Sequence, residues 1–378
     1  MKSEDKDVVE QSGSEEKVFT LEEREEIAMQ EIEGMIDREI QDAMPETPAV
    51  DFTDIDGWIN TEPLSLEMLK GKVILLLFWT HTDIFCLRSI PIVRMLNKKY
   101  SAYDFAVVSV HCAEYDFANN LLNVKKAAAK YNVNFPVGID KENRTWQTYG
   151  NMYWPKHVLI DSAGMVRYEI AGLNNIRDLE LSIYGLLREA DKRPPPYFED
   201  EDPKDEIYDT YGTQFLGATR EIWDSVVHPV CVGYTKLERF GNIQKVEQSK
   251  VNEFKDAGEH IHNIVYLRGR WFWDKECVRF SGKPDDDAAI IMKYSAKRAN
   301  AIMGTVDGKQ AKVEVKIDGE YVTQKNLGND LKRNGSISSA DVEWTYVYNL
   351  IKTEEAETHE IEIIPKTDNF VFYTFLFG

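Results

Sequence analysis

Six consecutive apolar residues, Val73 to Phe78, place the strongest constraint on how this chain folds. A run of this kind predicts a strand that is buried on both faces, as the central strands of helix-covered sheets are. The segment from Trp79 to Cys86 follows at once and opens a helix over residues 84–100, which Pro91 interrupts. The sequence therefore predicts an α/β sheet in which a central strand leads straight into the N-terminus of a helix.

Alternating strand and helix patterns continue to about residue 190. Apolar runs predict strands, and apolar positions three or four residues apart predict helices. After the first helix, these patterns mark a strand at 105–111, a helix at 118–131, two paired strands at 156–161 and 165–171, and a closing helix at 177–190. Such alternation is typical of a sheet with parallel strands, so we assign residues 51–190 to one α/β domain.

Residues 191–207 are predicted to form a linker, because Pro194, Pro195 and Pro196 are followed by an acidic run that favours a semi-rigid spacer. Residues 208–378 lack a strong helical stripe. The segment 312–317 alternates polar and apolar residues before an Asp-Gly turn. Further strands are expected at 288–294, 344–351, 360–364 and 370–377. Short strands separated by turns predict an all-β sandwich domain.

The first 50 residues hold 16 acidic and 5 basic side chains, in a chain whose formal net charge is −20. We expect residues 1–18 to be an acidic tail and the rest of this extension to be an amphipathic helix. The helix could dock on the main body, pair with a second copy, or bind a partner protein. Its apolar face is formed by Ile32, Met35, Ile36 and Ile40.

The acidic charge argues against nucleic acid or an anionic membrane surface as a partner, since both require clustered Lys and Arg. No segment approaches the ~18 apolar residues of a membrane span, and the acidic N-terminus is unlike a signal peptide. The four cysteines are far apart and show no disulfide or metal spacing. We therefore expect a cytoplasmic protein with reduced thiols, and no cofactor or metal is indicated.

Asp83 and Cys86 are the candidate chemical residues, because both lie at the start of the helix that follows the central strand. Helix amides and the helix dipole stabilise a thiolate at such a position. A carboxylate at position 83 is a good N-cap, but its charge should raise the pKa of the nearby Cys86 thiol. His81, in the same loop, could accept a proton from Cys86, although a loop histidine is more often only solvated.

These segments resemble the thioredoxin-like domain of TlpA/DipZ proteins, which carry a Trp-Thr-x-x-Cys-x-x-Cys-Leu-Arg stretch. Trp79 and Thr80 match its start and Cys86-Leu87-Arg88 match its end, whereas Asp83 replaces the first, attacking cysteine. The resemblance implies that Trp154-Pro155 is a cis-proline loop facing the redox helix. Residues that match further along are Phe135-Pro136-Val137, Asp140, Thr145-Trp146, Tyr149-Gly150-Asn151 and Leu159-Ile160-Asp161. The implied substrate groove is formed by Trp79, Thr80, Trp154 and Pro155.

The second half of the chain is similar to the C-terminal domain of DipZ proteins, which is like a carbohydrate-binding module with a jelly-roll sandwich. The resemblance implies a thioredoxin fold, then a jelly-roll domain, with an acidic helical extension in front. The segments that match are Phe215-Leu216-Gly217, Leu267-x-Gly269-x-Trp271, Val315-x-Ile317-Asp318-Gly319, Tyr348-x-Leu350, His359-x-Ile361-x-Ile363 and Tyr373-Thr374-Phe375.

Two hypotheses about function follow. In the first, the chain is a monothiol oxidoreductase in which Cys86 forms a mixed disulfide with a protein or low-molecular-weight thiol, and an external thiol resolves it. In the second, it is a non-catalytic protein that binds a peptide, a protein or a glycan through the old groove, the sandwich or the seam between them. A peroxiredoxin is a weaker third, because its Thr-x-x-Cys spacing would require Thr at position 83.

Two further patterns receive little weight. Trp271 and Trp273 lie two residues apart on a predicted strand, as a sugar-stacking platform requires, although core packing is the commoner role. His260 and His262 have the spacing of two metal ligands on one strand face, but no third ligand is evident.

Overall fold

The computed structural model describes residues 47–172, 176–194, 230–237 and 239–378. The predicted acidic tail and amphipathic helix, together with the linker from residue 195 and the start of the region 208–378, lie outside the described residues. The domain boundaries expected there therefore stay predictions.

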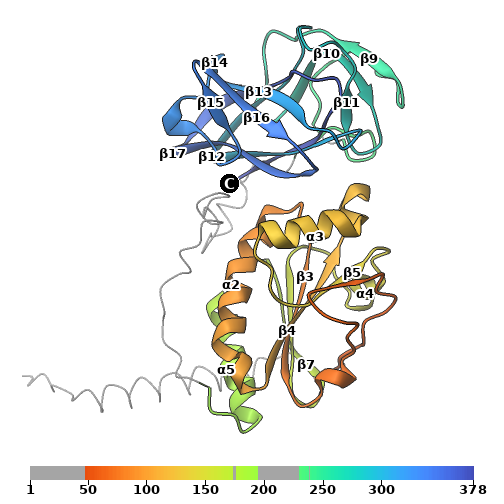
Figure 1. Ribbon diagram of the computed structural model, residues 1–378, viewed down its shortest axis with the longest axis vertical. Helices are drawn as coiled ribbons and strands as arrows, with labels where there is room; N and C mark the ends of the chain where they lie inside the picture. The colour runs from red at the N-terminus through yellow and green to blue at the C-terminus, as the bar shows by residue number, and fades with distance from the viewer. Residues whose placement is uncertain (1–46, 173–175, 195–229, 238) are drawn as a thin grey trace, which may run out of the picture. The chain divides into compact units, whose positions relative to one another are not determined.

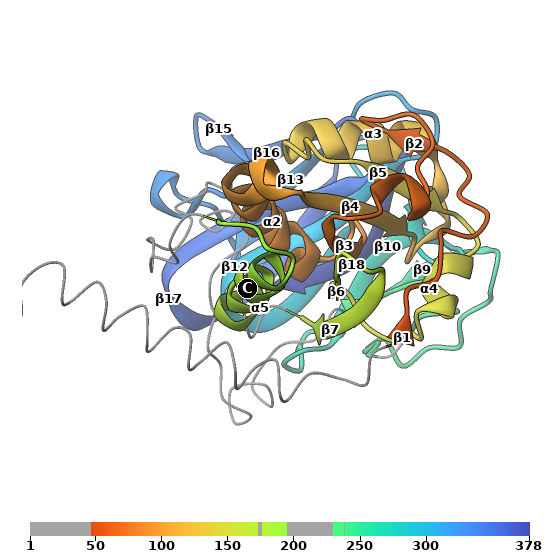
Figure 2. The ribbon, with the colours of Figure 1, turned by 90° about the horizontal axis from the view of Figure 1, so that it is seen from below.

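The first domain is built on a mixed seven-stranded sheet in the order β1-β7-β6-β3-β4-β5-β2, laid out in Figure 2. The strands are β1 Thr47–Pro48, β2 Trp58–Ile59, β3 Val73–Trp79, β4 Phe105–Cys112, β5 Val137–Asp140, β6 Lys156–Ile160 and β7 Met165–Ala171. The helices are α2 Ile84–Tyr100, α3 Leu121–Lys130, α4 Arg144–Thr148 and α5 Ile176–Glu189, with 3-10 turns η1 Glu67–Leu69, η2 Ser101–Tyr103 and η3 Asp116–Asn119.

β3 is the central strand, as its unbroken apolar run predicts, and all seven of its residues are buried. It pairs in parallel with β4 and antiparallel with β6. Because β3 and β4 are parallel, their carboxyl ends lie at the same edge of the sheet. The loop that leads to Cys86 and the loop that follows β4 therefore emerge side by side.

Helices cover both faces of this sheet. Figure 1 shows α2 and α5 on one face and α4 on the other. On the α4 side, the Phe78 ring packs edge-on against Trp146 at 6.0 Å and tilted against Tyr149 at 5.2 Å between ring centroids. Burial on both faces explains why β3 contains no polar residue.

The second domain is all-β. Its strands are β8 Val230–Cys231, β9 Val251–Phe254, β10 Val265–Trp273, β11 Val278–Phe280, β12 Ala289–Thr305, β13 Ala311–Ile317, β14 Glu320–Tyr321, β15 Lys332–Asn334, β16 Ile337–Val342, β17 Tyr346–Pro365 and β18 Phe370–Phe377, with η4 Gln324–Asn326. The hydrogen-bonded order is β15-β16-β13-β17-β12-β10-β11-β18-β8, and β12 also pairs with β18. The all-β class is as predicted, while the jelly-roll connectivity stays a prediction.

Two strand predictions in this domain are wrong. The segments 344–351 and 360–364 are predicted as separate strands, but residues 346–351 and 360–364 belong to the single 20-residue strand β17, Tyr346–Pro365. Residues 354–358 are exposed, and all but Ala356 are polar, so they interrupt the apolar pattern as a turn does. Likewise, the strand predicted at 288–294 extends to Thr305, because irregularities in pairing near Ala296 and Ala299 let one strand bend and continue.

The structure also overturns the weaker binding patterns. Trp271 and Trp273 are 0% and 4% exposed, so they are core residues and not a sugar-stacking platform. His260 directs its two ring nitrogens at Asp256 and Glu360, and His262 is bonded to Ser295. No cluster of three metal-ligating side chains occurs within the described residues.

Candidate functional site

Cys86 lies in the first turn of α2 and is fully buried. Asp83 is the N-cap of this helix, and its Oδ1 accepts a hydrogen bond from the Cys86 amide at 2.8 Å. The Cys86 Sγ in turn accepts a bond from the Thr80 amide at 3.4 Å. The predicted cap is therefore in place, and Pro91 lies inside α2 without ending it.

The electrostatics of the site disfavour a thiolate. Burial, followed by the charge of Asp83, raises the pKa of the Cys86 thiol well above its ordinary value, although the Thr80 amide acts in the opposite direction. Burial also raises the pKa of Asp83, to about 6, against the hydrogen bond from Cys86. Near neutral pH, Cys86 is thus a protonated thiol beside a largely ionised carboxylate.

Each of the four cysteines is a free thiol. Cys112 is buried and lies 3.8 Å from a carboxylate oxygen of Asp140, and Cys231 contacts the hydroxyl of Tyr115 at 3.4 Å. Cys277 is buried on the second domain. Within the described residues Cys86 has no disulfide partner.

His81 is paired with another histidine and is not solvated. Its ring is fully buried and its Nδ1 lies 2.8 Å from Nε2 of His111. The same Nε2 accepts the backbone N–H of His81 at 3.3 Å, so Nδ1 of His81 carries the proton that it donates to His111. Burial lowers the pKa of His81 to about 3. The expectation of a solvated loop histidine is wrong, and His81 is a weak base for Cys86.

Glu114 is a residue that the sequence reasoning missed. It follows β4, and its Oε2 accepts a hydrogen bond from Thr82 Oγ1 at 3.2 Å. Thr82 Oγ1 lies 2.9 Å from Thr80 Oγ1, which extends the polar chain toward Cys86. Burial raises the pKa of Glu114 to about 7. The signal was available, because side chains that follow neighbouring parallel strands meet at one edge of the sheet.

The proposed groove residues differ in exposure. Trp79 and Thr80 are fully buried, and the indole Nε1 of Trp79 donates to Ser109 Oγ at 3.2 Å. The Trp154-Pro155 peptide bond is cis, as the resemblance implies. Trp154 is half-buried and stacks on Trp146 with ring centroids 4.4 Å apart.

The segment just before the cis bond is exposed. Met152 and Tyr153 are 73% and 65% exposed.

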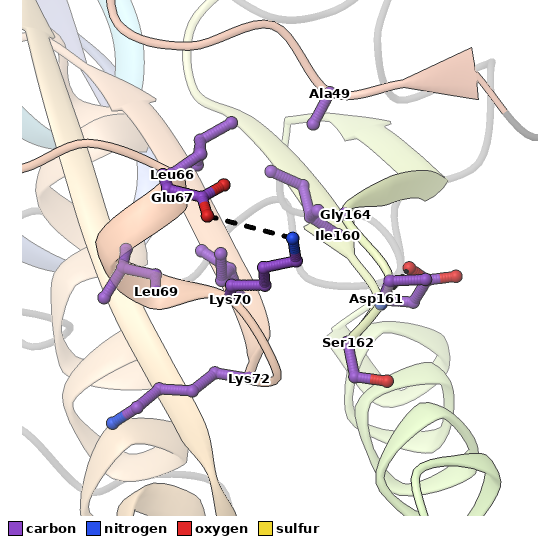
Figure 3. Close-up of a pocket in the computed structure, with 12 residues that line it drawn as sticks. Ala49, Leu66, Glu67, Leu69, Lys70, Lys72, Ile160, Asp161, Ser162 and Gly164 are labelled. Atoms are coloured by element: carbon purple, nitrogen blue, oxygen red, sulfur yellow. Dashed lines mark hydrogen bonds and ion pairs between the residues drawn. The ribbon is translucent and has the colours of Figure 1, made fainter.

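A cavity of about 210 Å³ lies elsewhere in this domain, between η1 and the turn that joins β6 to β7. Leu66, Leu69 and Ile160 contribute apolar walls, and Figure 3 shows Lys70 reaching across it, paired with Glu67 at 3.8 Å. The cavity adjoins the start of β3, whereas Cys86 follows the end of that strand. It is separate from the Cys86 site.

Comparison with known proteins agrees with this geometry. A family model described as "Redoxin" matches residues 44–184, and one described as "Thioredoxin like C-terminal domain" matches residues 230–378. Thiol-disulfide oxidoreductase ResA from Bacillus thuringiensis is 32% identical over 135 residues, covering 36% of this chain and 73% of ResA. The chain belongs to the thioredoxin-like redoxin family. It is also similar to Protein DipZ from Mycobacterium bovis, with 31% identity over 298 residues.

The similarity to DipZ covers both domains, since it extends over 75% of this chain, but the chain spans only 39% of the length of DipZ. Among solved structures, a putative thiol:disulfide interchange protein DsbE from Chlorobium tepidum is 27% identical, with a TM-score of 0.34, and covers 38% of this chain and 98% of that chain. Within the described residues of this redoxin, no helix is both long and apolar enough to cross a membrane.

Proposed function

We propose that this redoxin binds a peptide or protein segment beside its cis-proline loop and does not perform dithiol–disulfide exchange. One observation supports the proposal above all others. Cys86 is the one thiol of the described site, and the carboxylate of Asp83 caps the helix where the family pattern has an attacking cysteine.

Two physical arguments lead from that observation to the loss of exchange chemistry. A thiolate is the nucleophile in disulfide exchange, and Cys86 is fully buried with a raised pKa. A second thiol is then required to break the mixed disulfide from within, and the described site offers a carboxylate instead. A carboxylate cannot form that sulfur–sulfur bond.

The binding half of the proposal depends on the cis-proline loop. Met152 and Tyr153 present two large, exposed side chains directly before Trp154 and Pro155. An extended segment can pair with backbone groups in such a loop while apolar side chains give it affinity. We favour a protein or peptide ligand over a glycan, because Trp271 and Trp273, the two sandwich residues that could stack on a sugar, are buried.

Monothiol chemistry at Cys86 is the second candidate, and one contact favours it. The Thr80 amide donates a hydrogen bond to Sγ, and such a bond stabilises a thiolate. In this mechanism the Cys86 thiolate attacks a disulfide of a protein or small molecule and expels one thiolate. An external thiol then attacks the mixed disulfide and releases Cys86.

Reduction of insulin disulfides tests the proposal. The native chain should show no dithiol kinetics, while Asp83→Cys should gain activity by orders of magnitude because it supplies the missing thiol. Asp83→Ser, which is similar in size but lacks sulfur, is the matched control and should stay inactive. Dithiol kinetics in the native chain would refute the proposal. Loss of a slow native activity in Cys86→Ser would favour the monothiol candidate.

Binding is tested separately with a fluorescently labelled insulin B-chain. Tyr153→Ala should weaken its binding about ten-fold, the effect of removing one aromatic contact residue at an interface. Met68→Ala is the control, because Met68 is similarly exposed, at 64%, and lies at the other end of the domain. Equal affinity in both variants would contradict the role of the cis-proline loop. The cytoplasmic location remains a proposal from composition, to be checked by cell fractionation.

A further inference from the structure

The loop that precedes α2 is buried to an unusual degree. Thr80, His81 and Thr82 are each 0% exposed, although they connect a strand to a helix. Connecting segments normally run over the protein surface, because their backbone polar groups need water or other partners. Three consecutive fully buried residues therefore require a cover from another part of the chain.

Aromatic residues from both domains lie over His81. The ring of Phe117, from η3, is 6.0 Å from the His81 ring, edge-on. The ring of Trp344, from the sandwich, is 6.5 Å away and tilted by 34°. Trp344 in turn stacks on Tyr346 at 4.6 Å. Tyr346 is the first residue of β17, and Trp344 lies two residues before it.

Two lysines of α3 make cation–π contacts with Trp344 and Tyr346. The Lys130 ammonium lies 4.3 Å from the centre of the Tyr346 ring and 3.5 Å from a carboxylate oxygen of Asp330. Lys126 lies 5.8 Å from the centre of the Trp344 ring. Cation–π contacts of this geometry are favourable even where water reaches them.

A second group of contacts involves the loop after β4. Lys236 Nζ donates to the backbone oxygen of Glu114 at 2.6 Å and lies 3.8 Å from the centre of the Tyr115 ring. The Asp116 amide donates to Glu276 Oε2 at 2.8 Å. Lys236 and Glu276 belong to the sandwich, while the other three belong to the redoxin domain. The residues that surround Cys86 are thus tied to the sandwich at two separate places.

We propose that the sandwich domain is a cover for the Cys86 loop, with Trp344 over His81 and with Lys130 and Lys236 as the contacts that keep it closed. The inference goes beyond the proposed function, because it concerns access to the loop and does not depend on what the cis-proline loop binds. A reagent or partner reaches residues 80–82 only when these contacts open.

A reporter thiol measures that opening. Thr82→Cys places a sulfur at a fully buried position of the loop, and its reaction with iodoacetamide is followed residue by residue in the full chain. Adding Lys130→Glu removes the cation–π contact and repels Asp330, so reaction at position 82 should become roughly five-fold faster, as expected for the loss of one cation–π contact. Trp344→Ala should accelerate it as well.

Lys125→Glu is the matched control, since it makes the same charge change on the same helix at an exposed position. It should leave the rate unchanged. In chains without the Thr82→Cys reporter, hydrogen exchange of amides 80–83 should likewise be faster with Lys130→Glu than with Lys125→Glu. If Lys130→Glu lowers the melting temperature, Lys130→Ala replaces it. This variant also removes the cation–π contact, without repelling Asp330, and should also make the reaction at position 82 faster. The proposal is overturned if the reporter reacts as fast as an unfolded thiol in the otherwise native chain, or if the two lysine positions give equal rates.

Discussion

The two domains bury polar side chains of different kinds. The buried acidic and basic residues of the redoxin domain are His81, Arg88, His111, Asp140, Lys156, His157 and Glu180. In the described part of the sandwich, the buried polar residues are all neutral, namely Asn242, Asn252, Asn300, Ser338, Asn349 and Thr374. Ionisable groups are costly to bury and gather where chemistry or binding requires them. The contrast is consistent with the proposal that binding involves the redoxin domain, while the described core of the sandwich contains no buried acidic or basic side chain.

Acid should destabilise the redoxin domain before it destabilises the sandwich. This is the largest difference that we expect between the two domains. Burial lowers the pKa of His81 to about 3 and that of His157 to about 4, and it also lowers the pKa of His111. The unfolded chain therefore binds more protons below pH 6.5. The stability that comes from neutral imidazoles is complete above pH 6.5 and is lost as the pH falls toward 4, at about 1.4 kcal/mol per pH unit for each histidine.

Two carboxyl groups act in the opposite direction. The pKa values of Asp83 and Glu114 are raised to about 6 and about 7 in the folded chain. As the pH falls from 7, these two groups therefore bind protons in the folded chain before they do so in the unfolded chain, which favours folding. We expect a shallow loss of stability between pH 6 and 4.5 and a steeper loss below. Hydrogen exchange resolved by strand should show β3 and β4 losing protection before β12 and β17. Earlier opening of β12 and β17 would contradict the comparison.

His111→Leu should cost about 1–3 kcal/mol at pH 7.5, because it leaves two N–H groups of His81 without an acceptor in a buried place. The cost should shrink at pH 4.5, since the variant no longer has a buried imidazole at position 111 to charge. Urea unfolding at the two pH values measures both numbers. An unchanged or larger cost at pH 4.5 would show that the pair is not held neutral.

Asn349→Ala is the counterpart in the sandwich. Asn349 Nδ2 donates to Asn300 Oδ1 at 2.8 Å, and both residues are fully buried. Its removal should also cost about 1–3 kcal/mol, because a buried acceptor loses its donor. Neither side chain titrates, so the cost should be the same at pH 7.5 and pH 4.5. A marked pH dependence would remove the distinction between the two cores.

Asp83→Ala should have the smallest effect on stability, about 1 kcal/mol, because it deletes the N-cap of α2. Asp83→Asn is the matched variant that keeps a capping oxygen without the charge, and it should stay within about 0.5 kcal/mol of the native chain. Both variants remove the charge that raises the pKa of Cys86. Thermal unfolding together with alkylation of Cys86 separates the cap from the charge. A larger loss in Asp83→Asn than in Asp83→Ala would contradict the capping role.

Much of the redoxin domain could be predicted from the sequence, because its signals are local. The apolar run at 73–78 and the cap at Asp83 each depend on a few neighbouring residues. The cis bond at Trp154-Pro155 is predicted only by the resemblance to TlpA/DipZ proteins. In the sandwich, the sequence predicts two strands where the structure has the single strand β17, because an exposed polar stretch within a long strand has the same pattern as a turn.

The surroundings of Cys86 could not be predicted in the same way. His81 and His111 are 30 residues apart, and their pairing depends on the register of two parallel strands, in which Trp79 lies opposite His111. Lys236 is 122 residues from Glu114. Contacts between such distant positions leave no periodic signal in one sequence. The sequence therefore predicts the cap at Asp83 and the place of Cys86 on α2, but not the contacts of His81 and Glu114.

The rate of Cys86 alkylation as a function of pH tests the central claim most directly. If the thiol is buried beside an ionised Asp83, the rate should keep rising beyond the ordinary thiol pKa of ~8.5, with no plateau near neutrality. A plateau at or below pH 7, with fast reaction at neutral pH, would show a stabilised thiolate and contradict the account of a binding redoxin with an inert sulfur.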